Sequence, residues 1–349
     1  MNLEVNGHNI ILIVLVTFLT SVLLTPFIIK AADHIGAMDI PNERKVHKKP
    51  IPRLGGLAIF GAFLLGYMLF ARTSNQMLSI LIGGFLVVLV GIFDDVKPVP
   101  AKIKFIVQVL AAAVVVFYGR IFFGRITFLG LDFTFPVPLN YLFTILFMVG
   151  TMNAINLIDG LDGLASGISS IYFATIAIIA FILNKMQGLD TILALIMLGS
   201  TLGFLVWNFN PAKIFMGDTG SLFLGFTISV ISLLGFKGAT LTSFIIPIVI
   251  LSIPIFDTGL AILRRILKGE KISAPDKEHF HHQLLKMKFS MKATVLIIYA
   301  INILFASVSI FFVLGDAKMA VLIYVILMLL VLFLVMKTDI LFQHKKKDS

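Results

Sequence analysis

The polar residues most able to do chemistry interrupt an apolar region at residues 153–167, which read "NAINLIDGLDGLASG". Two amides and two carboxylates stand there at intervals of three residues: Asn153, Asn156, Asp159 and Asp162. If the segment stays helical, residues three apart lie on one side of the helix. Gly160 and Gly163 would then let a flat ligand approach the backbone. Capping of two helix ends is the simpler alternative, and an EF-hand is excluded because its ligands alternate at every second position.

A pair of adjacent carboxylates, Asp94 and Asp95, stands at the end of another apolar run in "FDDVK". Such a pair is costly near low dielectric unless a cation or a proton lies between the two groups. Three lysines follow closely, at Lys97, Lys102 and Lys104. This combination suits a metal and a phosphate together, and the simpler alternative is a solvated helix end or a cap for the next helix.

Asp218, in "IFMGDTGS", stands where a further apolar run begins. Aspartate is a favoured N-cap residue, and the neighbouring glycines suit a tight turn. A carboxylate is also the hard oxygen ligand that Mg²⁺ takes in proteins. The two roles are compatible, so Asp218 is a predicted helix cap and a predicted metal ligand.

A basic segment, "RRILKGEKISAPDKEHFHH", begins with Arg264 and Arg265. Paired arginines suit diphosphate oxygens, although they are equally common as anchors on the cytoplasmic side of a membrane. The segment ends with three histidines: His279, His281 and His282. These could bind zinc, but the usual ligand spacing is missing, so hydrogen bonds to a phosphate are an equal alternative. Asp257 lies in the preceding apolar run and has no assigned role.

The composition points to a membrane protein. Of 349 residues, 59% are hydrophobic and only 13% are charged, and the mean hydropathy is +1.04. Apolar runs of about 20 residues, enough to cross a bilayer, recur along the sequence. We therefore expect one all-α polytopic membrane domain over residues 1–349, with a basic cytoplasmic tail at 338–349. Because there is no cysteine and no Walker A loop, phosphate binding must come from Lys, Arg, His and metal.

Eleven membrane spans are expected, at residues 9–30, 55–71, 77–93, 104–119, 138–155, 164–184, 190–207, 219–236, 241–263, 292–314 and 318–337. With the N-terminus outside, most of the lysines and arginines fall in one set of loops, which the positive-inside rule assigns to the cytoplasm. The net charge of +10 then reflects orientation and contact with anionic lipid, and no nucleic-acid partner is expected. The first span has no basic segment before it, so a cleaved signal is not expected.

Five polar stretches fall in that cytoplasmic set of loops: "KKPIPRLGG", "FDDVKPVPAKIKFIVQ", "NLIDGLDG", "NFNPAKIFMGDTGS" and the basic histidine segment. Their convergence predicts one site at the cytoplasmic surface of the plasma membrane. A cation-coupled transporter is an alternative from another class, but it would place polar residues near the midplane and on both faces. A purely structural membrane scaffold would not explain five converging motifs.

This ordered set of motifs resembles the superfamily of polyprenyl-phosphate N-acetylhexosamine-1-phosphate transferases, which includes MraY, WecA and TagO. The resemblance extends over nearly the whole chain, from "RKVHKKPIPRLGG" to "EHFHHQL". It implies an eleven-span fold with an external N-terminus. It also implies transfer of a sugar 1-phosphate from a UDP-sugar to a polyprenyl phosphate, with release of UMP and a need for Mg²⁺ or Mn²⁺. A homodimer is a candidate assembly.

The resemblance also implies roles for individual residues. Asp218 would bind the metal, and Asp94 and Asp95 would form an essential catalytic pair, either as a base or as organisers of metal and phosphate. The nucleotide pocket would contain Lys48, Asn156, Asp159, Gly160, Leu161, Asp162, Asn208 and Phe215. Lys104 would hold the phosphate of the lipid acceptor. The other residues that would hold phosphates are Arg264, Arg265, His279, His281 and His282.

Two stretches separate the branches of this superfamily. Enzymes that use UDP-MurNAc-pentapeptide resemble one another in "PTMGG" and in a run of three histidines, whereas this chain reads "PIPRLGG" and "HFHH". Both differences resemble the WecA/TagO branch, whose donor is UDP-GlcNAc and whose acceptor is undecaprenyl phosphate. The expected reaction is the first membrane step of teichoic acid or related surface polysaccharide synthesis. The alternative is the phospho-MurNAc-pentapeptide transferase of peptidoglycan synthesis.

Overall fold

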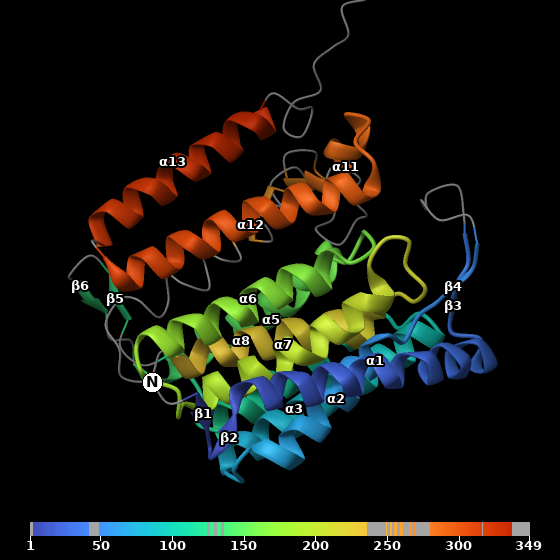
Figure 1. Cartoon of the computed structure of the whole chain (residues 1–349), viewed down its shortest axis with the longest axis horizontal. Helices are drawn as coiled ribbons and strands as arrows, with labels where there is room; N and C mark the ends of the chain where they lie inside the picture. Colours follow the sequence, from blue (N-terminus) through green and yellow to red (C-terminus); the bar gives the residue numbers. More distant parts are fainter. Residues whose placement is uncertain are drawn as a thin grey trace, which may run out of the picture. The chain divides into compact units, whose positions relative to one another are not determined.

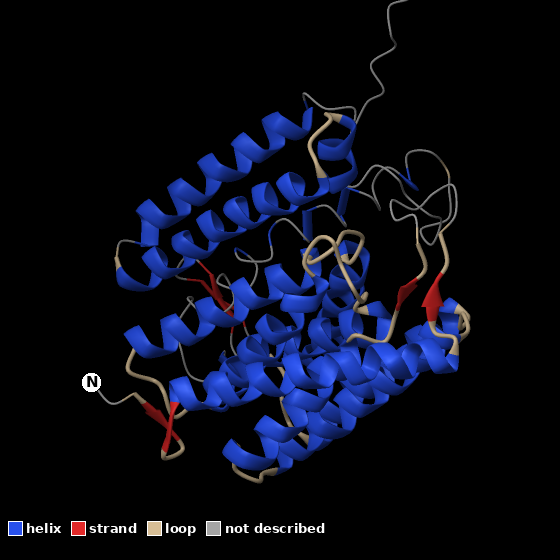
Figure 2. Cartoon of the chain, turned by 45° about the vertical axis from the view of Figure 1, so that its right-hand side comes forward, coloured by secondary structure: helices blue, strands red, loops and turns tan. Residues whose placement is uncertain are grey.

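The computed structural model describes residues 3–41, 49–123, 126–128, 131–133, 136–235, 280–315 and 317–336, with positions 249, 252, 255–256, 259–260, 265–266 and 269. The chain forms two compact units, Met1–Phe244 and Ile245–Ser349, and each is described by itself. Most of the described residues are helical, and the strands are short (Figure 2).

The first unit is a bundle of long helices (Figure 1). They are α1 (Ile10–Ile35), α2 (Gly56–Phe70), α3 (Asn75–Val96), α4 (Ala101–Ala113) continued by a π-helical turn (Val114–Tyr118), α5 (Val137–Ile158), α6 (Leu164–Ile182), α7 (Leu189–Asn208) and α8 (Gly217–Gly235). Three antiparallel strand pairs lie before or between them: β1 (Glu4–Val5) with β2 (His8–Asn9), β3 (Met38–Asp39) with β4 (Ile51–Pro52), and β5 (Ile126–Phe128) with β6 (Leu131–Phe133). In Figure 1, β3 and β4 lie at the opposite end of the bundle from β1 and β2.

The second unit contains a short helix followed by two long ones. These are α11 (Phe280–Lys286), α12 (Met291–Leu314) and α13 (Ala317–Met336). The last two run side by side in Figure 1 and pack on each other. The Ser252 and Tyr324 hydroxyls lie 3.1 Å apart, so α13 also contacts the segment before α11.

The prediction of a polytopic helical membrane protein is confirmed. Within the described residues, eight helices are long and apolar enough to cross a membrane, and Gly56–Phe70 and Lys318–Phe333 are shorter apolar helical stretches. Every predicted span except 241–263 coincides with a helix, and most of 241–263 lies outside the described residues, as does Asp257. The count of eleven and the direction of insertion therefore stay predictions.

Local sequence signals explain where several helices begin and end. The side chain of Asn9 accepts a hydrogen bond from the backbone of Ile11 at the start of α1, and Ser74 does the same for Met77 at the start of α3. Such oxygens satisfy backbone N–H groups that have no partner within the helix. Gly36 ends α1 in the left-handed conformation, with φ of 79°, which glycine adopts without strain.

Helix α8 is the most buried of the eight long apolar helices that the structure describes, since 94% of its most apolar segment lies inside the protein. It packs most extensively on α3 and α5 and also contacts α2, α6 and α7. Two glycines allow the close approach of its first turn. A Cβ at Gly56 of α2 would collide with the backbone of Gly220, and a Cβ at Gly91 of α3 would collide with the backbone of Thr219. Backbone packing therefore fixes the start of α8 between α2 and α3.

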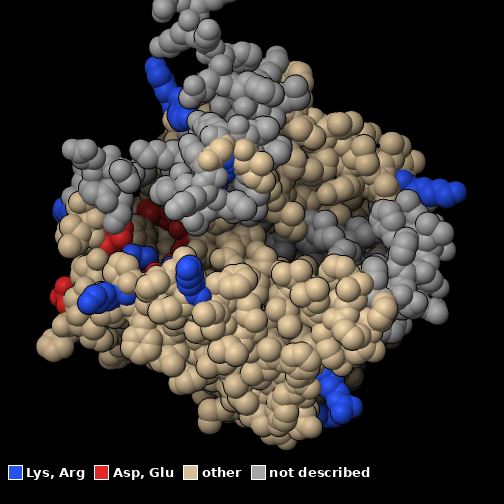
Figure 3. Space-filling view, turned by 180° about the vertical axis from the view of Figure 1, so that it is seen from behind, with Lys and Arg blue, Asp and Glu red and all other residues tan. Residues whose placement is uncertain are grey.

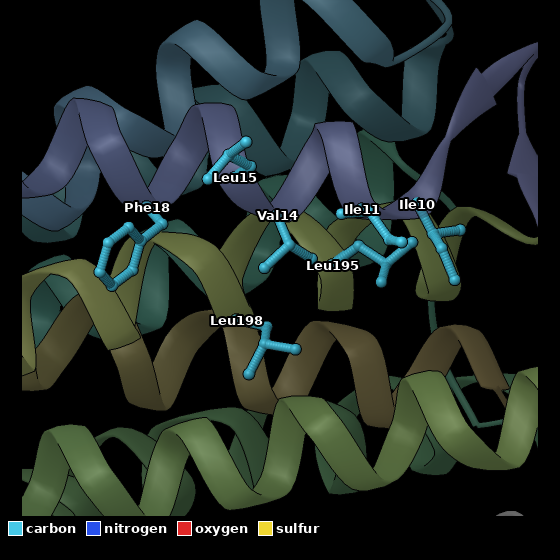
Figure 4. Close-up of a pocket in the computed structure, with 7 residues that line it drawn as sticks. All are labelled: Ile10, Ile11, Val14, Leu15, Phe18, Leu195 and Leu198. Atoms are coloured by element: carbon cyan, nitrogen blue, oxygen red, sulfur yellow. The ribbon is translucent and has the colours of Figure 1, made fainter.

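A shallow apolar groove lies on a different part of the first unit, between α1 and α7. Figure 4 shows its lining residues, which are Ile10, Ile11, Val14, Leu15, Phe18, Leu195 and Leu198. All of these side chains are hydrocarbon, so the groove suits contact with lipid chains and offers no group for phosphate or metal.

Candidate active site

The segment that joins α7 to α8 is held against the start of α2 by backbone hydrogen bonds. The Phe215 N–H donates to the Pro52 carbonyl at 2.8 Å, the Gly55 N–H donates to the Phe215 carbonyl at 3.0 Å, and the Gly56 N–H donates to the Met216 carbonyl at 2.9 Å. These bonds bring "PIPRLGG" and "IFMGDTGS" together, as the convergence of polar stretches predicts. The first turn of α8 is thereby placed beside the end of α3.

Asp95, near the end of α3, is a buried cap for α8. Its Oδ1 accepts from the backbone N–H of Asp218 at 2.9 Å, and its Oδ2 accepts from the backbone N–H and the hydroxyl of Thr219 at 3.0 and 2.7 Å. Arg53 Nε lies 3.4 Å from the same Oδ1. A carboxylate is stable at a helix N-terminus because it accepts from free N–H groups and faces the positive end of the helix dipole. The predicted cap of α8 thus comes from Asp95 rather than from Asp218.

The carboxyl group of Asp218 is left free to face outward from that turn, where it meets polar side chains from α4 and α5. Lys104 Nζ lies 2.9 Å from Asp218 Oδ2 and 3.2 Å from Asp94 Oδ1. Asn156 donates to Asp218 Oδ1 at 3.0 Å and to the Ser221 hydroxyl at 2.8 Å. Two carboxylates, an ammonium group and an amide therefore meet in one cluster, which we call the Asp218 cluster.

The Asp218 cluster unites four predicted residues from three separate stretches of sequence. Asp94 is held in turn by the backbone N–H of Val99, which donates to its Oδ1 at 2.8 Å. On the face of the molecule in Figure 3, acidic and basic atoms gather at one edge, while most of the remaining described surface is uncharged. Partly exposed charge in a mostly apolar molecule is typical of a site that meets a polar ligand.

The turn after α5 does not continue the helix. The helix ends at Ile158, and Gly163 adopts φ of 80°, which is a left-handed conformation that stops helical propagation. The condition for a shared helical side of Asn156, Asp159 and Asp162 is therefore not met. Asp162 Oδ2 instead accepts from Asn210 Nδ2 at 2.8 Å and from the backbone N–H of Ala212 at 3.0 Å, so it ties this turn to the segment after α7.

Asp159, in the same turn, has an altered acidity. Burial raises the pKa of the Asp159 carboxyl to about 7, and the nearby negative charge of Asp218 raises this pKa further. Desolvation disfavours the charged form of a carboxyl, and a neighbouring carboxylate acts in the same direction. Such a group changes charge near neutral pH, which is common at ligand-binding sites.

The raised pKa of Asp159 predicts that the stability of the folded protein depends on pH. Its pKa is about 7 in the folded protein against 3.8 for an ordinary aspartate, so the folded state binds the proton more tightly and loses stability as the pH rises from about 4 to about 7. Asp159→Asn removes that loss. We expect the Tm of the variant, relative to the unchanged protein, to be higher at pH 8 than at pH 5. Fluorescence of the single tryptophan in detergent would measure it, and an equal difference at both pH values would contradict the shift.

Other predicted nucleotide residues are engaged within the protein. The Asn208 side chain is buried, donates to the Ile214 carbonyl at 3.0 Å and accepts from the Ser166 hydroxyl at 2.8 Å. Leu161 is buried, Gly160 is exposed, and Phe215 is half-buried. Asn208 therefore shapes the segment that carries Phe215 and leads to Asp218.

The remaining predicted phosphate and nucleotide residues belong to the second unit or have no described side chain. Arg265 is buried in the second unit. The predicted residues that fall outside the described residues or outside the described side chains are Lys48, Arg264, His279, His281 and His282. Their roles stay predictions.

The residues of the Asp218 cluster fit a divalent cation. One carboxylate oxygen of Asp94 and one of Asp218 face the same point, where the Lys104 ammonium group lies. A position between two carboxylates that accepts one positive charge also suits a metal ion. Hard oxygen donors of this kind are the ligands that Mg²⁺ and Mn²⁺ take. Among the described residues there is no group of three or more His, Cys, Asp or Glu side chains that could hold a metal. The protein can thus offer two carboxylates, with substrate oxygens or water completing the shell.

Sequence reasoning missed three contributors to the site. Arg53 lies in a stretch that was recognised as polar, but its pairing with Asp95 was not expected. Thr219 follows Asp218 directly and binds Asp95, and Ser221 contacts Asn156. The sequence signal for Thr219 and Ser221 is their position beside Asp218, and for Arg53 it is the polar stretch in which it lies.

Comparison with known protein families identifies the same part of the chain. Residues 77–236 match the family model described as glycosyl transferase family 4. That range contains every member of the Asp218 cluster.

Several relatives align along most of the chain. A protein of Bacillus subtilis (strain 168) named probable undecaprenyl-phosphate N-acetylglucosaminyl 1-phosphate transferase is 45% identical over 85% of this chain and 83% of its own length. The decaprenyl-phosphate N-acetylglucosaminephosphotransferase of Mycobacterium tuberculosis (strain CDC 1551 / Oshkosh) is 34% identical over 77% of this chain and 74% of its own length. The undecaprenyl-phosphate alpha-N-acetylglucosaminyl 1-phosphate transferase of Escherichia coli (strain K12) is 28% identical over 84% of this chain and 81% of its own length. The chain therefore belongs to glycosyl transferase family 4, within the superfamily of polyprenyl-phosphate N-acetylhexosamine-1-phosphate transferases.

Proposed function

We propose that the protein transfers GlcNAc-1-phosphate from UDP-GlcNAc to undecaprenyl phosphate and releases UMP. The observation that carries this proposal is the Asp218 cluster, whose carboxylates and lysine suit a metal-assisted reaction between two phosphates. The names of the relatives support the choice of donor and acceptor. The reaction is enzymatic transfer, with an anionic lipid phosphate as the nucleophile.

The bond changes can be written without a strong base. A phosphate oxygen of the acceptor is already anionic at neutral pH, so it can attack the β-phosphorus of the donor directly. The bond from that phosphorus to the oxygen bridging to the α-phosphate breaks, and the electron pair leaves with UMP. The product is undecaprenyl-diphosphate-GlcNAc. What the site must supply is therefore position and positive charge rather than deprotonation.

The chain's own residues divide these tasks. Asp218 and Asp94 would hold Mg²⁺, which when bound offsets charge on the donor diphosphate. Asn156 orients the Asp218 carboxyl through its 3.0 Å hydrogen bond. Lys104 is the cation best placed to bind an acceptor phosphate, because its ammonium group already lies between the two carboxylates. Asp159 and the turn around it would form a wall of the nucleotide pocket.

The lipid acceptor also constrains where the site can lie. Its phosphate stays at the membrane surface, so we propose that this end of the bundle faces the cytoplasm, with eleven spans, an external N-terminus and one transferase domain over residues 1–349. Mapping of introduced cysteines with a membrane-impermeant reagent would test this orientation, since the natural chain has none. We further propose that the product feeds wall teichoic acid or a related surface polymer.

A UMP-release assay tests the proposed reaction. Purified protein in detergent receives undecaprenyl phosphate, Mg²⁺ and either UDP-GlcNAc or UDP-MurNAc-pentapeptide. We expect UMP only with UDP-GlcNAc, because the "PIPRLGG" and "HFHH" stretches resemble the branch that uses it. Release only with the pentapeptide donor would assign the protein to peptidoglycan synthesis instead. No release from either donor, in protein shown to be folded, would remove the proposed substrate pair.

Lys104→Gln tests the assignment of the acceptor phosphate. Removing the ammonium group leaves two carboxylates facing each other and takes away a phosphate partner, so we expect the KM for undecaprenyl phosphate to rise about tenfold or more. The KM for UDP-GlcNAc should change much less. Lys102→Gln, at an exposed position on the same turn of α4, is the matched control. A larger effect on the donor KM than on the acceptor KM would assign Lys104 to the donor.

A further inference from the structure

The two adjacent aspartates of "FDDVK" face different surroundings, which suggests different roles. The Asp95 side chain is fully buried, with 0% of its surface exposed, whereas 12% of the Asp94 side chain is exposed and it faces Lys104. Successive residues on a helix point in directions about 100° apart, so one can face the site while the next faces the protein interior. Only Asp94 is placed to meet a ligand.

Most of the hydrogen-bonding capacity of Asp95 is used within the protein. An ionised carboxylate has about four acceptor positions on its two oxygens. The structure fills three of them with two backbone N–H groups and the Thr219 hydroxyl, and the Arg53 guanidinium group forms an ion pair with Oδ1. The carboxyl also lies directly against Gly217, where φ is 69° and a Cβ would collide with both oxygens. Asp95 therefore spends its oxygens on contacts within the protein, whereas Asp94 faces the Asp218 cluster.

Arg53 supplies the charge that makes this buried carboxylate tolerable. Burial of an unpaired carboxylate is costly, and a charged partner offsets that cost. Arg53 Nε lies 3.4 Å from Asp95, and its Nη1 lies 3.6 Å from Asp39 Oδ1 in β3. The arginine thus joins the end of α3 to β3 and to the segment that leads into α2.

The backbone around Arg53 is held in one conformation. Leu54 has φ of 84°, which is unfavourable for a bulky residue, and its side chain is buried against Ala32 and Ala37. A strained conformation of this kind persists only where surrounding contacts maintain it. The same segment forms backbone hydrogen bonds with residues 215–216, just before α8. The backbone on either side of Arg53 is therefore held beside the start of α8, which Asp95 caps.

We propose that Asp95 and Arg53 are positioning residues, which together with Thr219 fix the first turn of α8 so that the Asp218 carboxyl faces the metal and the donor diphosphate. Neither Asp95 nor Arg53 touches a substrate. The proposal rests on the proposed function for its kinetic consequences. It separates the two aspartates, since Asp94 is then the member of the pair that contacts ligand.

Variants of Arg53 test the proposal kinetically. In Arg53→Gln the Asp95 carboxylate loses its counter-charge and Asp218 shifts, so we expect kcat to fall by about 10- to 100-fold. The KM for UDP-GlcNAc should stay within about twofold, because no substrate contact is removed. Arg53→Lys keeps the charge and should recover a large part of kcat. Arg72→Gln, an exposed arginine beyond the other end of α2, is the control.

A pair of variants at Thr219 provides a gentler test. Thr219→Val keeps the side-chain shape and removes only the hydroxyl that donates to Asp95 at 2.7 Å, whereas Thr219→Ser keeps that hydroxyl. We expect the valine variant to lose kcat and the serine variant to approach the unchanged protein. Binding of Mn²⁺, measured by electron paramagnetic resonance without substrates, should weaken about tenfold in Thr219→Val and in Arg53→Gln.

Several results would overturn the proposal. A raised KM for UDP-GlcNAc with unchanged kcat in Arg53→Gln would mean that Arg53 binds the donor. Equal losses in the serine and valine variants, or unchanged Mn²⁺ affinity in Thr219→Val, would mean that the contact does not position Asp218. If the unchanged protein releases no UMP from any donor, the proposed function fails, and the Mn²⁺ comparison still tests the positioning.

Discussion

Replacing Asp218 with alanine is expected to lower the kcat of UMP release by about 10³-fold or more. Asp218 is the carboxylate to which Lys104 and Asn156 both converge, so its loss removes a metal ligand and the partner of both side chains. Loss of one preorganised electrostatic partner at a phosphoryl-transfer site typically costs about 10²- to 10³-fold, and loss of a metal ligand adds to that. Initial rates of UMP formation at saturating UDP-GlcNAc and undecaprenyl phosphate would measure it.

Two further variants make that result specific. Asp218→Asn keeps the side-chain volume and the bond from Asn156 but removes the charge, so it should be nearly as inactive as the alanine variant. Asp33→Ala removes an exposed carboxylate near the end of α1 and should leave kcat within about twofold. Asp218→Ala activity above a tenth of that of the unchanged protein, with the same Mg²⁺ dependence, would place the metal elsewhere.

The membrane helices could be predicted from the sequence because apolar length is a local property. A run of about 20 apolar residues must cross a bilayer or be buried whatever lies around it. The residues at which these helices end were harder to predict. The first span was expected at 9–30, whereas α1 continues to Ile35 through a polar turn that holds Lys30 and Asp33. Hydropathy falls there although helical hydrogen bonding does not, and only the left-handed Gly36 ends the helix.

The site was predictable in outline for a different reason. Topology sends alternate loops to the same side, so acidic motifs far apart in sequence had to meet at one end of the bundle. The structure does bring Asp94, Lys104, Asn156 and Asp218 together. What the sequence could not show is which atom of each side chain is used. The capping of α8 by Asp95 joins residues more than a hundred positions apart, and only the folded backbone defines that contact.

The turn at Asp159 shows how a correct motif can be given the wrong geometry. The spans predicted at 138–155 and 164–184 left residues 156–163 between them, and spacing by three residues would have given the polar side chains a shared side only in a continuous helix. The glycines were assigned to ligand approach. In the structure Gly163 uses its freedom to adopt a positive φ, which redirects the chain into α6. Asp162 then turns toward Asn210 instead of sharing a side with Asn156. Periodicity alone cannot distinguish these outcomes, because glycine permits both.

Replacing Gly56 with alanine is expected to destabilise the protein and to abolish most of its activity together. The added Cβ would collide with the backbone of Gly220, and a backbone atom cannot rotate away as the end of a side chain can. Helix α2 would have to move from the first turn of α8, which would also strain the hydrogen bond from the Gly56 N–H to the Met216 carbonyl. Overpacking of this kind costs about 1–3 kcal/mol or more, so we expect the Tm in detergent to fall by about 5 °C or more.

A second glycine in a membrane helix serves as the matched control for that prediction. A Cβ at Gly150 of α5 meets nothing within 4 Å, so Gly150→Ala gains helix propensity at no steric cost and should be neutral or slightly stabilising. Since Gly56 touches no substrate, any loss of kcat in Gly56→Ala must come through displacement of α8 and of Asp218 on it. Assay of the variant well below its Tm separates that displacement from unfolding. Full activity in folded Gly56→Ala protein would show that the start of α8 can move without disturbing the Asp218 cluster.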